Sequence, residues 1–394
     1  MFSRHVTGLL FATMFPQIAV AMISLAPPVV GDQIIADLGL SPAVVGAYTG
    51  LVYIFVFVSN LITPQLVAAF GALRLSFGCI VLGGLTLAVF GNAALVVAIA
   101  ATVFIGLSYG PLTPATSFAL VTMARSSGFN LLVSIRQTSV PLGGMLAGLV
   151  VPYLNLLYGW RTALTIVGLG LALLGLGTAF LLKSVRDDRP PAGFGASKGI
   201  FAPFLFIVRR PRLFRLALAS LVYGALQLIM SSFIVLYLVS QLKVDHVWAG
   251  IFLGVMQISG IFGRIFWGYL ADRMHSPRLM MALIGFGMAV SALVTGALTE
   301  GIAPMLIGAA MVAFGATASG WNGVFLAEVM REVEPSQAGF ATAGGLFFVY
   351  IGVIVGPPLF GLAVSAFDFR ASFAGLAAVA LMAGVMCLER RAPD

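Results

Sequence analysis

The segment Gly268-Tyr-Leu-Ala-Asp-Arg273 is a short charged stretch between two long apolar runs. The run that follows it, residues 279–299, carries no charged residue and is long enough to cross a bilayer, which takes about 20 apolar residues in a helix. Five other charge-free runs reach that length, and one of them holds two crossings: residues 7–30, 75–124, 162–182, 216–242 and 301–327.

The composition of the whole chain agrees with this pattern. Its 394 residues are 60% hydrophobic and 9% charged, with a mean hydropathy of +1.09. Soluble domains are about half apolar and about one quarter charged, so a soluble protein is excluded. Strands of a membrane barrel alternate apolar and polar residues, whereas these runs are apolar on all sides and favour helices.

We therefore predict an all-α polytopic membrane protein with twelve membrane-spanning helices. The predicted spans are residues 8–30, 43–67, 75–91, 94–120, 130–153, 162–183, 213–239, 248–270, 279–299, 302–327, 339–363 and 371–388. The first of them is too long for a secretory signal and has no obvious cleavage site, so we expect it to stay in the protein.

Basic residues are distributed unevenly over the two sides of this topology. With a cytoplasmic N-terminus, sixteen fall on the cytoplasmic side and three, Arg161, Lys243 and Arg370, on the other. The positive-inside rule predicts such an asymmetry. It explains most of the net charge of +8 without nucleic-acid binding, and it predicts cytoplasmic N- and C-termini in a bacterial-type inner membrane.

Cysteine and histidine give no sign of a metal or redox centre. Cys79 and Cys387 fall inside apolar spans, where they are expected to be buried thiols. The three histidines fall near membrane surfaces and form no ligand cluster. We expect no metal, no cofactor and no enzymatic activity.

One long polar interruption separates the first six spans from the last six. We predict an N-terminal bundle at residues 1–183, a cytoplasmic linker at 184–212 and a C-terminal bundle at 213–394. Within the linker, residues 199–208 are apolar and aromatic between basic neighbours, which predicts a short interfacial helix. Its basic flanks serve either an anionic-lipid site or simple control of topology.

The two halves share a sequence register. A shift of 204 positions places Gly50 on Gly254 and Arg74 on Arg278, so that span two falls on span eight. Such matches indicate two pseudo-symmetric six-helix repeats in parallel orientation.

The charged segment quoted above resembles the loop motif of the major facilitator superfamily of secondary transporters. The resemblance implies two six-helix bundles, alternating access and a substrate site near the bilayer midplane. It also implies a gating role for Gly268, Asp272 and Arg273, because the motif holds the cytoplasmic helix ends together. Glu328 and Arg331, at the end of the tenth span, are the expected partners of Arg273 and Asp272.

Two arginines, Arg136 and Arg264, are the basic residues placed within spans, and no Asp or Glu falls in the middle of any span. An unpaired cation there costs at least ~2.5 kcal/mol. An anionic substrate would offset this cost, since guanidinium binds carboxylates through two parallel bonds. Alternatively, both arginines reach the cytoplasmic interface or bond backbone carbonyls, helped by Glu328.

The resemblance bears on both arginines and on further polar residues. Arg264 is similar to the eighth-span arginine of superfamily porters for oxalate, monocarboxylates and nitrate, whereas the second-span arginine of nitrate porters is replaced by Asn60. Spans one, four, seven and ten line the cavity in this superfamily. Six residues there are candidate substrate contacts, with helix–helix hydrogen bonding as the alternative for each: Gln17, Tyr109, Tyr223, Gln227, Trp321 and Asn322.

The sequence thus predicts a secondary active or facilitated transporter of a small organic anion, a carboxylate, working as an antiporter, symporter or facilitator. We expect a monomer surrounded by membrane lipid. Two alternatives remain within transport: a multidrug or amphipathic-compound transporter, and a transporter of neutral solutes such as sugars. A third, of another class, is a transport-inactive membrane sensor or assembly partner built on the same fold.

Overall fold

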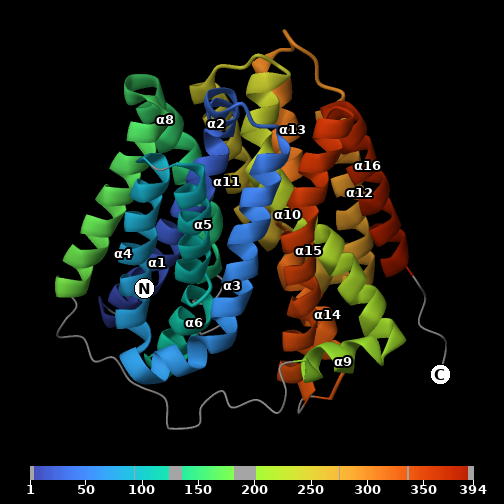
Figure 1. The fold of residues 1–394 in the computed structure, drawn as a ribbon. Helices are drawn as coiled ribbons and strands as arrows, with labels where there is room; N and C mark the ends of the chain where they lie inside the picture. The colour runs from blue at the N-terminus through green and yellow to red at the C-terminus, as the bar shows by residue number, and fades with distance from the viewer. Residues whose placement is uncertain are drawn as a thin grey trace. The chain divides into compact units, whose positions relative to one another are not determined.

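The computed structural model describes residues 4–92, 94–123, 135–181, 201–274, 276–334 and 337–388, and the regular elements in these ranges are all helices (Figure 1). Eleven helical stretches of the described chain are long and apolar enough to cross a membrane. One of them contains a break that makes it two crossings, which gives the twelve predicted. The all-α polytopic prediction is therefore confirmed. Residues 130–134 of the fifth predicted span, 182–183 of the sixth and 184–200 of the linker lie outside the described residues.

Two compact units make up the chain. The first comprises Met1–Ile34 and Leu51–Ser197, and the second comprises Ile35–Gly50 and Lys198–Asp394. The short helix α2 (Gly31–Leu38) and the long helix α3 (Ala43–Phe70) are each divided between the units. Besides most of α3, the first unit contains α1 (Arg4–Val29), α4 (Ala72–Asn92), α5 (Leu95–Tyr109), α6 (Leu112–Met123) and α8 (Ser139–Leu181).

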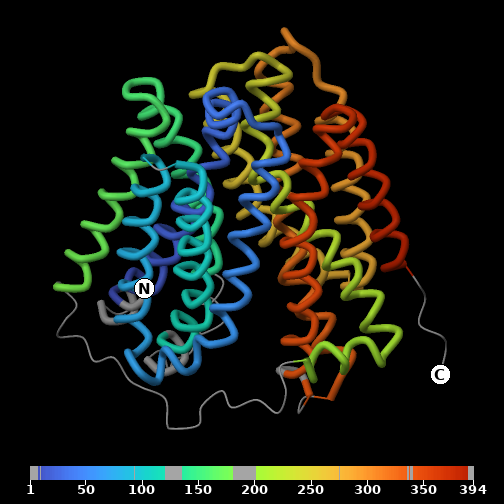
Figure 2. The backbone as a smooth tube through the Cα atoms, viewed as in Figure 1, coloured from blue at the N-terminus to red at the C-terminus, as the bar shows by residue number. Residues whose placement is uncertain are grey.

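The helix α8 is a hairpin of two membrane crossings. Gly159 interrupts it with φ 75° and ψ 161°, a conformation that a side chain at this position would strain. The green trace of α8 in Figure 2 reverses direction at one end of the unit. Each half of the hairpin packs on a different neighbour, the first on α1 and the second on α4.

The second unit repeats this packing with separate helices. Its elements are α9 (Ala202–Val208), α10 (Pro211–Ser240), α11 (His246–Met274), α12 (Pro277–Gly296), α13 (Pro304–Ala318), α14 (Trp321–Arg331), α15 (Ala338–Ala366) and α16 (Phe369–Cys387). Here α15 packs on α10 and α16 packs on α12, as the two halves of α8 pack on α1 and α4.

Glycines allow the closest helix contacts in both units. A Cβ atom on Gly84 of α4 would lie 2.5 Å from the carbonyl oxygen of Gly168 of α8, and a Cβ atom on Gly285 of α12 would lie 2.9 Å from the Cα atom of Gly384 of α16. Without a hydrophobic driving force between helices in lipid, such small residues let the backbones approach and gain dispersion energy. The predicted internal repeat therefore has a structural counterpart.

The predicted interfacial segment is helical in its described part, α9. This helix packs on α15, where the rings of Phe204 and Phe348 stack with centroids 5.1 Å apart. A Cβ atom on Gly344 of α15 would collide with the carbonyl oxygen of Pro203, so glycine is needed for this approach. Phe201 and Leu205 remain 66% and 46% exposed, which is compatible with an interfacial position.

Two membrane crossings are broken near their middle. The chain leaves α5 at Gly110 and enters α6 after Pro111, and it leaves α13 at Ser319 and enters α14 after Gly320. At the first break Pro111 has no amide hydrogen to donate. At both breaks the glycine leaves room for a neighbour, since a Cβ atom on Gly110 would collide with the carbonyl oxygen of Val56 and one on Gly320 would lie 2.7 Å from the carbonyl oxygen of Ala316. Polar side chains flank both breaks, at the depth where transporters bind their substrates.

Candidate substrate site

A polar cluster in the first unit is centred on Arg136, in the helical turn before α8. Its Nη1 atom donates to Oε1 of Gln17 on α1 at 2.9 Å and to Oγ1 of Thr116 on α6 at 2.8 Å. The amide nitrogen of Gln17 in turn donates to Oγ1 of Thr113 at 3.1 Å. Arg136 is 2% exposed and Gln17 is 1% exposed. The structure thus brings together two of the predicted site residues, which lie 119 positions apart in the sequence.

The hydrogen-bond partners of Arg136 found among the described residues are neutral. Its Nε atom is buried and has no hydrogen-bond partner within that part of the chain. Amide and hydroxyl oxygens satisfy part of the guanidinium but do not balance its charge, and an uncompensated cation in a low-dielectric site is costly. An anion that reaches this cluster would therefore gain a strong, charge-assisted interaction.

Tyr109, another predicted contact, ends α5 directly before the break in that crossing. Its ring packs edge-on against Tyr53 of α3, with centroids 6.0 Å apart, and it is 8% exposed. Thr113 follows one helical turn later and already binds Gln17. An aromatic ring and a hydroxyl thus flank the break in this crossing.

A second cluster lies in the second unit, where α14 begins after Gly320. Oε1 of Gln227 on α10 accepts hydrogen bonds from Nε1 of Trp321 and from Nδ2 of Asn322, both at 3.2 Å. The ring of Trp321 meets that of Tyr223 edge-on, with centroids 6.1 Å apart. Tyr223 is fully buried, and its hydroxyl donates to the carbonyl oxygen of Met281 at 2.8 Å, which makes it a wall of the cluster.

Arg264 is bound to the break in the tenth crossing. Its Nε atom donates to the carbonyl oxygen of Ser319 at 2.9 Å, and the neighbouring Trp267 donates through Nε1 to the carbonyl oxygen of Ala316 at 3.1 Å. Both acceptors are backbone carbonyls at the C-terminal end of α13, where a helix has no further amides to donate to them. The Nε atom of Arg264 thus bonds a backbone carbonyl, as the alternative to substrate contact predicted.

The predicted gating residues lie at the adjoining ends of α11, α12 and α14. Nε of Arg278 lies 2.8 Å from Oε1 of Glu328, and its Nη2 lies 2.6 Å from Oε1 of Glu332. The expected partner of Glu328 was Arg273; Arg273 donates to the hydroxyl of Tyr269 at 3.3 Å, and Arg278 holds the carboxylate.

Sequence analysis did not name Arg278 or Glu332 as site residues, although two signals were available. Arg278 occupies the place that Arg74 has in the first repeat, and Glu332 follows Glu328 by four positions, which puts both carboxylates on one helix face. The other predicted gating positions, Asp272 and Arg331, are exposed.

Gly268 differs from the packing glycines of the same helix. A Cβ atom on it would meet no described atom within 4 Å, whereas a Cβ atom on Gly263 would collide with the carbonyl oxygen of Ala316 on α13. Close helix contact in this structure therefore depends on Gly263 and does not depend on Gly268.

Comparison with known proteins places the chain in a family. Residues 9–344 match the family model described as the Major Facilitator Superfamily. The chain belongs to the major facilitator superfamily. In agreement with its family and fold, this superfamily member is a multi-pass membrane transporter and not an enzyme. A search of curated proteins gives no significant match.

Solved structures of transporters share the fold of this superfamily member. A bacterial homolog of the human lysosomal transporter Spinster, inward-facing and unoccupied, is 17% identical with a TM-score of 0.77 over 98% of this chain and 96% of that chain. A mutant of the nucleoside transporter NupG is 18% identical with a TM-score of 0.81, over 98% and 100%. A mutant of the peptide transporter POT is 17% identical with a TM-score of 0.75, over 97% and 93%. At these identities the likeness concerns the fold alone.

The described residues do not gather any three His, Cys, Asp or Glu side chains as a metal site would require. The polar groups available for a ligand are thus a guanidinium, amides, hydroxyls and an indole. This set suits an anion or a hydrogen-bonding neutral solute.

Proposed function

We propose that this superfamily member carries a small organic anion, a carboxylate, across a bacterial-type inner membrane by alternating access. The observation that supports the proposal most directly is the buried Arg136, with neutral partners and an unpartnered Nε atom among the described residues. A carboxylate would supply the missing negative charge and accept the remaining donors.

Transport without a resident acid at this cluster fits exchange of one anion for another or facilitated movement. In either case the substrate enters with its own charge and leaves the arginine for the next anion. The link from Arg278 to Glu328 and Glu332 serves as the cytoplasmic latch in this proposal, since it joins the ends of α12 and α14. The distribution of basic residues supports a cytoplasmic position for both termini in this proposal.

A neutral solute is the second candidate, and the second unit supports it. An indole next to two amides, as in Trp321, Gln227 and Asn322, is a combination that stacks on a ring and hydrogen-bonds hydroxyls. Sugars fit this description, and so do nucleosides, the cargo named for the structural neighbour NupG.

Thermal stabilisation of the purified protein separates the two candidates, because a ligand that binds only the folded state raises its stability. The panel contains mono- and dicarboxylates, inorganic anions, amines, sugars, nucleosides and dipeptides, together with 5-aminolevulinic acid, which is bound in the structure of a POT-family neighbour. Stabilisation by carboxylates should disappear in Arg136→Gln and persist in Arg74→Gln, an exposed arginine of the same unit.

Stabilisation by neutral compounds alone, unchanged in Arg136→Gln, would reject the anion proposal and favour the sugar or nucleoside alternative. Stabilisation by amphipathic cations would favour a multidrug transporter. If no compound binds and proteoliposomes loaded with carboxylates exchange none, the protein is better explained as a sensor or assembly partner.

A further inference from the structure

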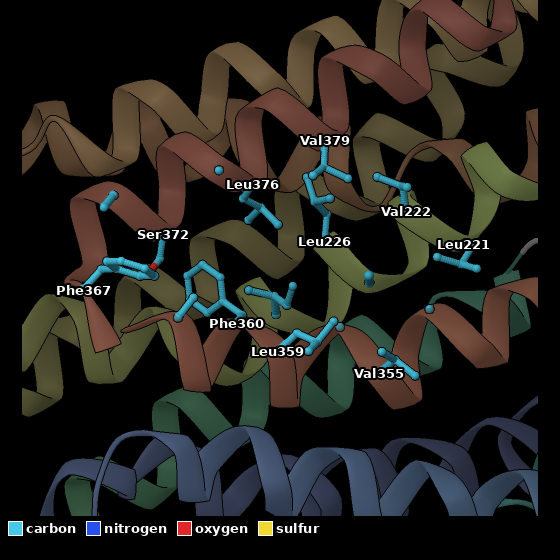
Figure 3. A pocket seen from close by; sticks show the side chains of 17 residues that line it. Leu221, Val222, Leu226, Val355, Leu359, Phe360, Phe367, Ser372, Leu376 and Val379 are labelled. Atoms are coloured by element: carbon cyan, nitrogen blue, oxygen red, sulfur yellow. The ribbon is translucent and has the colours of Figure 1, made fainter. Parts of the chain in front are cut away.

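A deep apolar groove lies in the second unit between α10, α15 and α16. Its volume is about 450 Å³. Both α15 and α16 pack on α10 but contact each other only lightly, so a space remains between them. Figure 3 shows Leu226 of α10, Leu359 and Phe360 of α15 and Leu376 of α16 arranged around this space.

The lining of the groove offers almost nothing to a polar ligand. Ser372 carries the one side-chain hydroxyl among the lining residues, and this hydroxyl donates to the carbonyl oxygen of Asp368 at 2.6 Å. The ring of Phe360 packs against Phe233 and Phe373, with centroids 5.1 and 5.4 Å away, and makes a rigid wall. A hydrocarbon chain is the occupant that this lining accepts without a polar penalty.

The groove opens toward the surroundings of membrane-spanning helices. Its rim residues Val355, Leu359 and Val379 are 44%, 59% and 40% exposed, although all lie within apolar spans. Lipid is the medium that meets such a surface in a bilayer. An acyl chain in the groove would contact α10, α15 and α16 at once, and so would gain more dispersion energy than a chain that touches a single helix.

The groove is about as long as one lipid leaflet is thick, longer along α15 and shorter along α16. Along α15 the lining extends from Gly352 to Phe367, which is about 22 Å at a rise of 1.5 Å per residue. Along α16 it extends from Ala371 to Val379, about 12 Å by the same rise. The hydrocarbon core of a bilayer is about 30 Å thick, so one leaflet contributes about 15 Å.

Arg370 lies in the first turn of α16, near the end of the groove where α15 connects to α16, and is not itself a lining residue. Arg370 is exposed, is followed directly by the lining residue Ala371, and has no partner among the described residues. The nearby carboxylate of Asp368 is engaged as the N-cap of α16, where it accepts from the amide of Ala371 at 2.6 Å. Phe367, 78% exposed, completes the rim with a ring suited to the membrane interface.

We propose that the groove between α10, α15 and α16 is a binding site for a membrane phospholipid, with one acyl chain in the groove and the headgroup phosphate at Arg370. The site is separate from the Arg136 and Gln227 clusters, and it does not depend on which solute is transported. Bound lipid stabilises the α10–α15–α16 side of the unit, because it fills a groove that these helices leave open.

Gly375 provides a sharp test. It lines the groove, and a Cβ atom on it would meet no described atom within 4 Å, so Gly375→Leu places a side chain in the free space. Gly177→Leu in α8 is the matched control, because Gly177 is also exposed in an apolar span and equally free of neighbours, but lies outside the groove.

The measurement is native mass spectrometry of the detergent-purified full chain titrated with phosphatidylglycerol. Wild type and Gly177→Leu should retain one phospholipid, and Gly375→Leu should bind it about tenfold more weakly. Arg370→Gln should weaken phosphatidylglycerol but leave diacylglycerol, which has no phosphate, unchanged. Equal retention by Gly375→Leu and wild type would overturn the proposal, as would a dimer whose formation excludes lipid from the groove.

A second variant keeps the proposal testable if Gly375→Leu does not fold. Leu359→Trp places a fluorophore on the exposed rim, and lipids with brominated acyl chains should quench it more than they quench the four native tryptophans together. Quenching that persists after dilution into lipid-free detergent supports a held chain. Quenching that vanishes at once on dilution shows ordinary annular lipid and rejects the site.

Discussion

Nη1 of Arg136 lies 2.9 Å from Oε1 of Gln17, so the buried cation of the first unit is held by a neutral amide. The same nitrogen is shared with Thr116 at 2.8 Å. This arrangement orients the guanidinium without neutralising it. It makes Gln17 a positioning residue, with effects on stability and on anion binding that can be measured separately.

The first prediction concerns this pair. Gln17→Ala should lower the free energy of unfolding by about 1–3 kcal/mol, because a buried donor loses its acceptor. It should also weaken carboxylate binding, since the guanidinium is no longer fixed. Chemical denaturation and ligand-induced thermal shifts measure the two effects, with the exposed Gln65→Ala as control. A Gln17→Ala protein with the stability and ligand affinity of the wild type would contradict the prediction.

The second prediction concerns the ion pair between Arg278 and Glu328. Arg278→Gln leaves Glu328, whose side chain is 8% exposed, without its partner. The side chain of Arg278 is 21% exposed, so solvent screens the pair in part. We therefore expect the free energy of unfolding to fall by roughly 1–3 kcal/mol, which is below the range for a fully buried pair.

A double-mutant cycle isolates the coupling between the two side chains. Adding Glu328→Gln to Arg278→Gln should restore part of the lost stability, because Glu328 is then neutral, whereas Glu332, whose side chain is 13% exposed, still lacks its arginine. Arg331→Gln, at an exposed position of the same helix end, should change little. Additive losses in the double variant would show that the pair is not coupled.

The third prediction compares two glycines of α11. Gly263→Ala should destabilise the protein by about 1–3 kcal/mol, because its Cβ atom would collide with the backbone of α13. Gly268→Ala should keep the wild-type melting temperature, since its Cβ atom meets no described atom. Should Gly268→Ala also slow transport in proteoliposomes, the glycine of the charged loop acts in a conformation other than this one.

The fourth prediction uses tryptophan fluorescence. Trp321 is 1% exposed and bonded to Gln227, whereas Trp248 is 57% exposed. A ligand that binds the second cluster should change the emission of wild type and of Trp248→Phe, and should leave Trp321→Phe unchanged. If the signal survives in Trp321→Phe, the ligand does not contact this cluster.

The membrane topology could be predicted from sequence because lipid imposes a length and a composition on every crossing. The break at Gly159 and the turns at Gly110 and Gly320 fall where glycine or proline interrupts an apolar run, so they too have a local signal. Close helix contacts are different. Gly84 and Gly168 are ordinary glycines in the sequence, and only the packed structure shows that they face each other.

The sequence was enough to name residues of the candidate site, but it did not show which of them bond to one another. Gln17 and Arg136 were chosen independently for polarity in apolar surroundings, and folding joins them. The partner of Glu328 was missed because the turn between α11 and α12 carries Arg278, not Arg273, to the carboxylate.

The short helix α14 has consequences for how a bound solute is sensed. Trp321 and Glu328 lie on it seven residues apart, about 10 Å along a segment of eleven residues that begins at a break. A rotation of this short helix about the break at Gly320 would move Glu328, which lies near its other end. By thermodynamic reciprocity, whatever a solute at Trp321 does to the strength of the Arg278 ion pair, that ion pair does to the affinity for the solute. Mutations at the end of α14 that carries Glu328 are thus a means of tuning affinity at a distance.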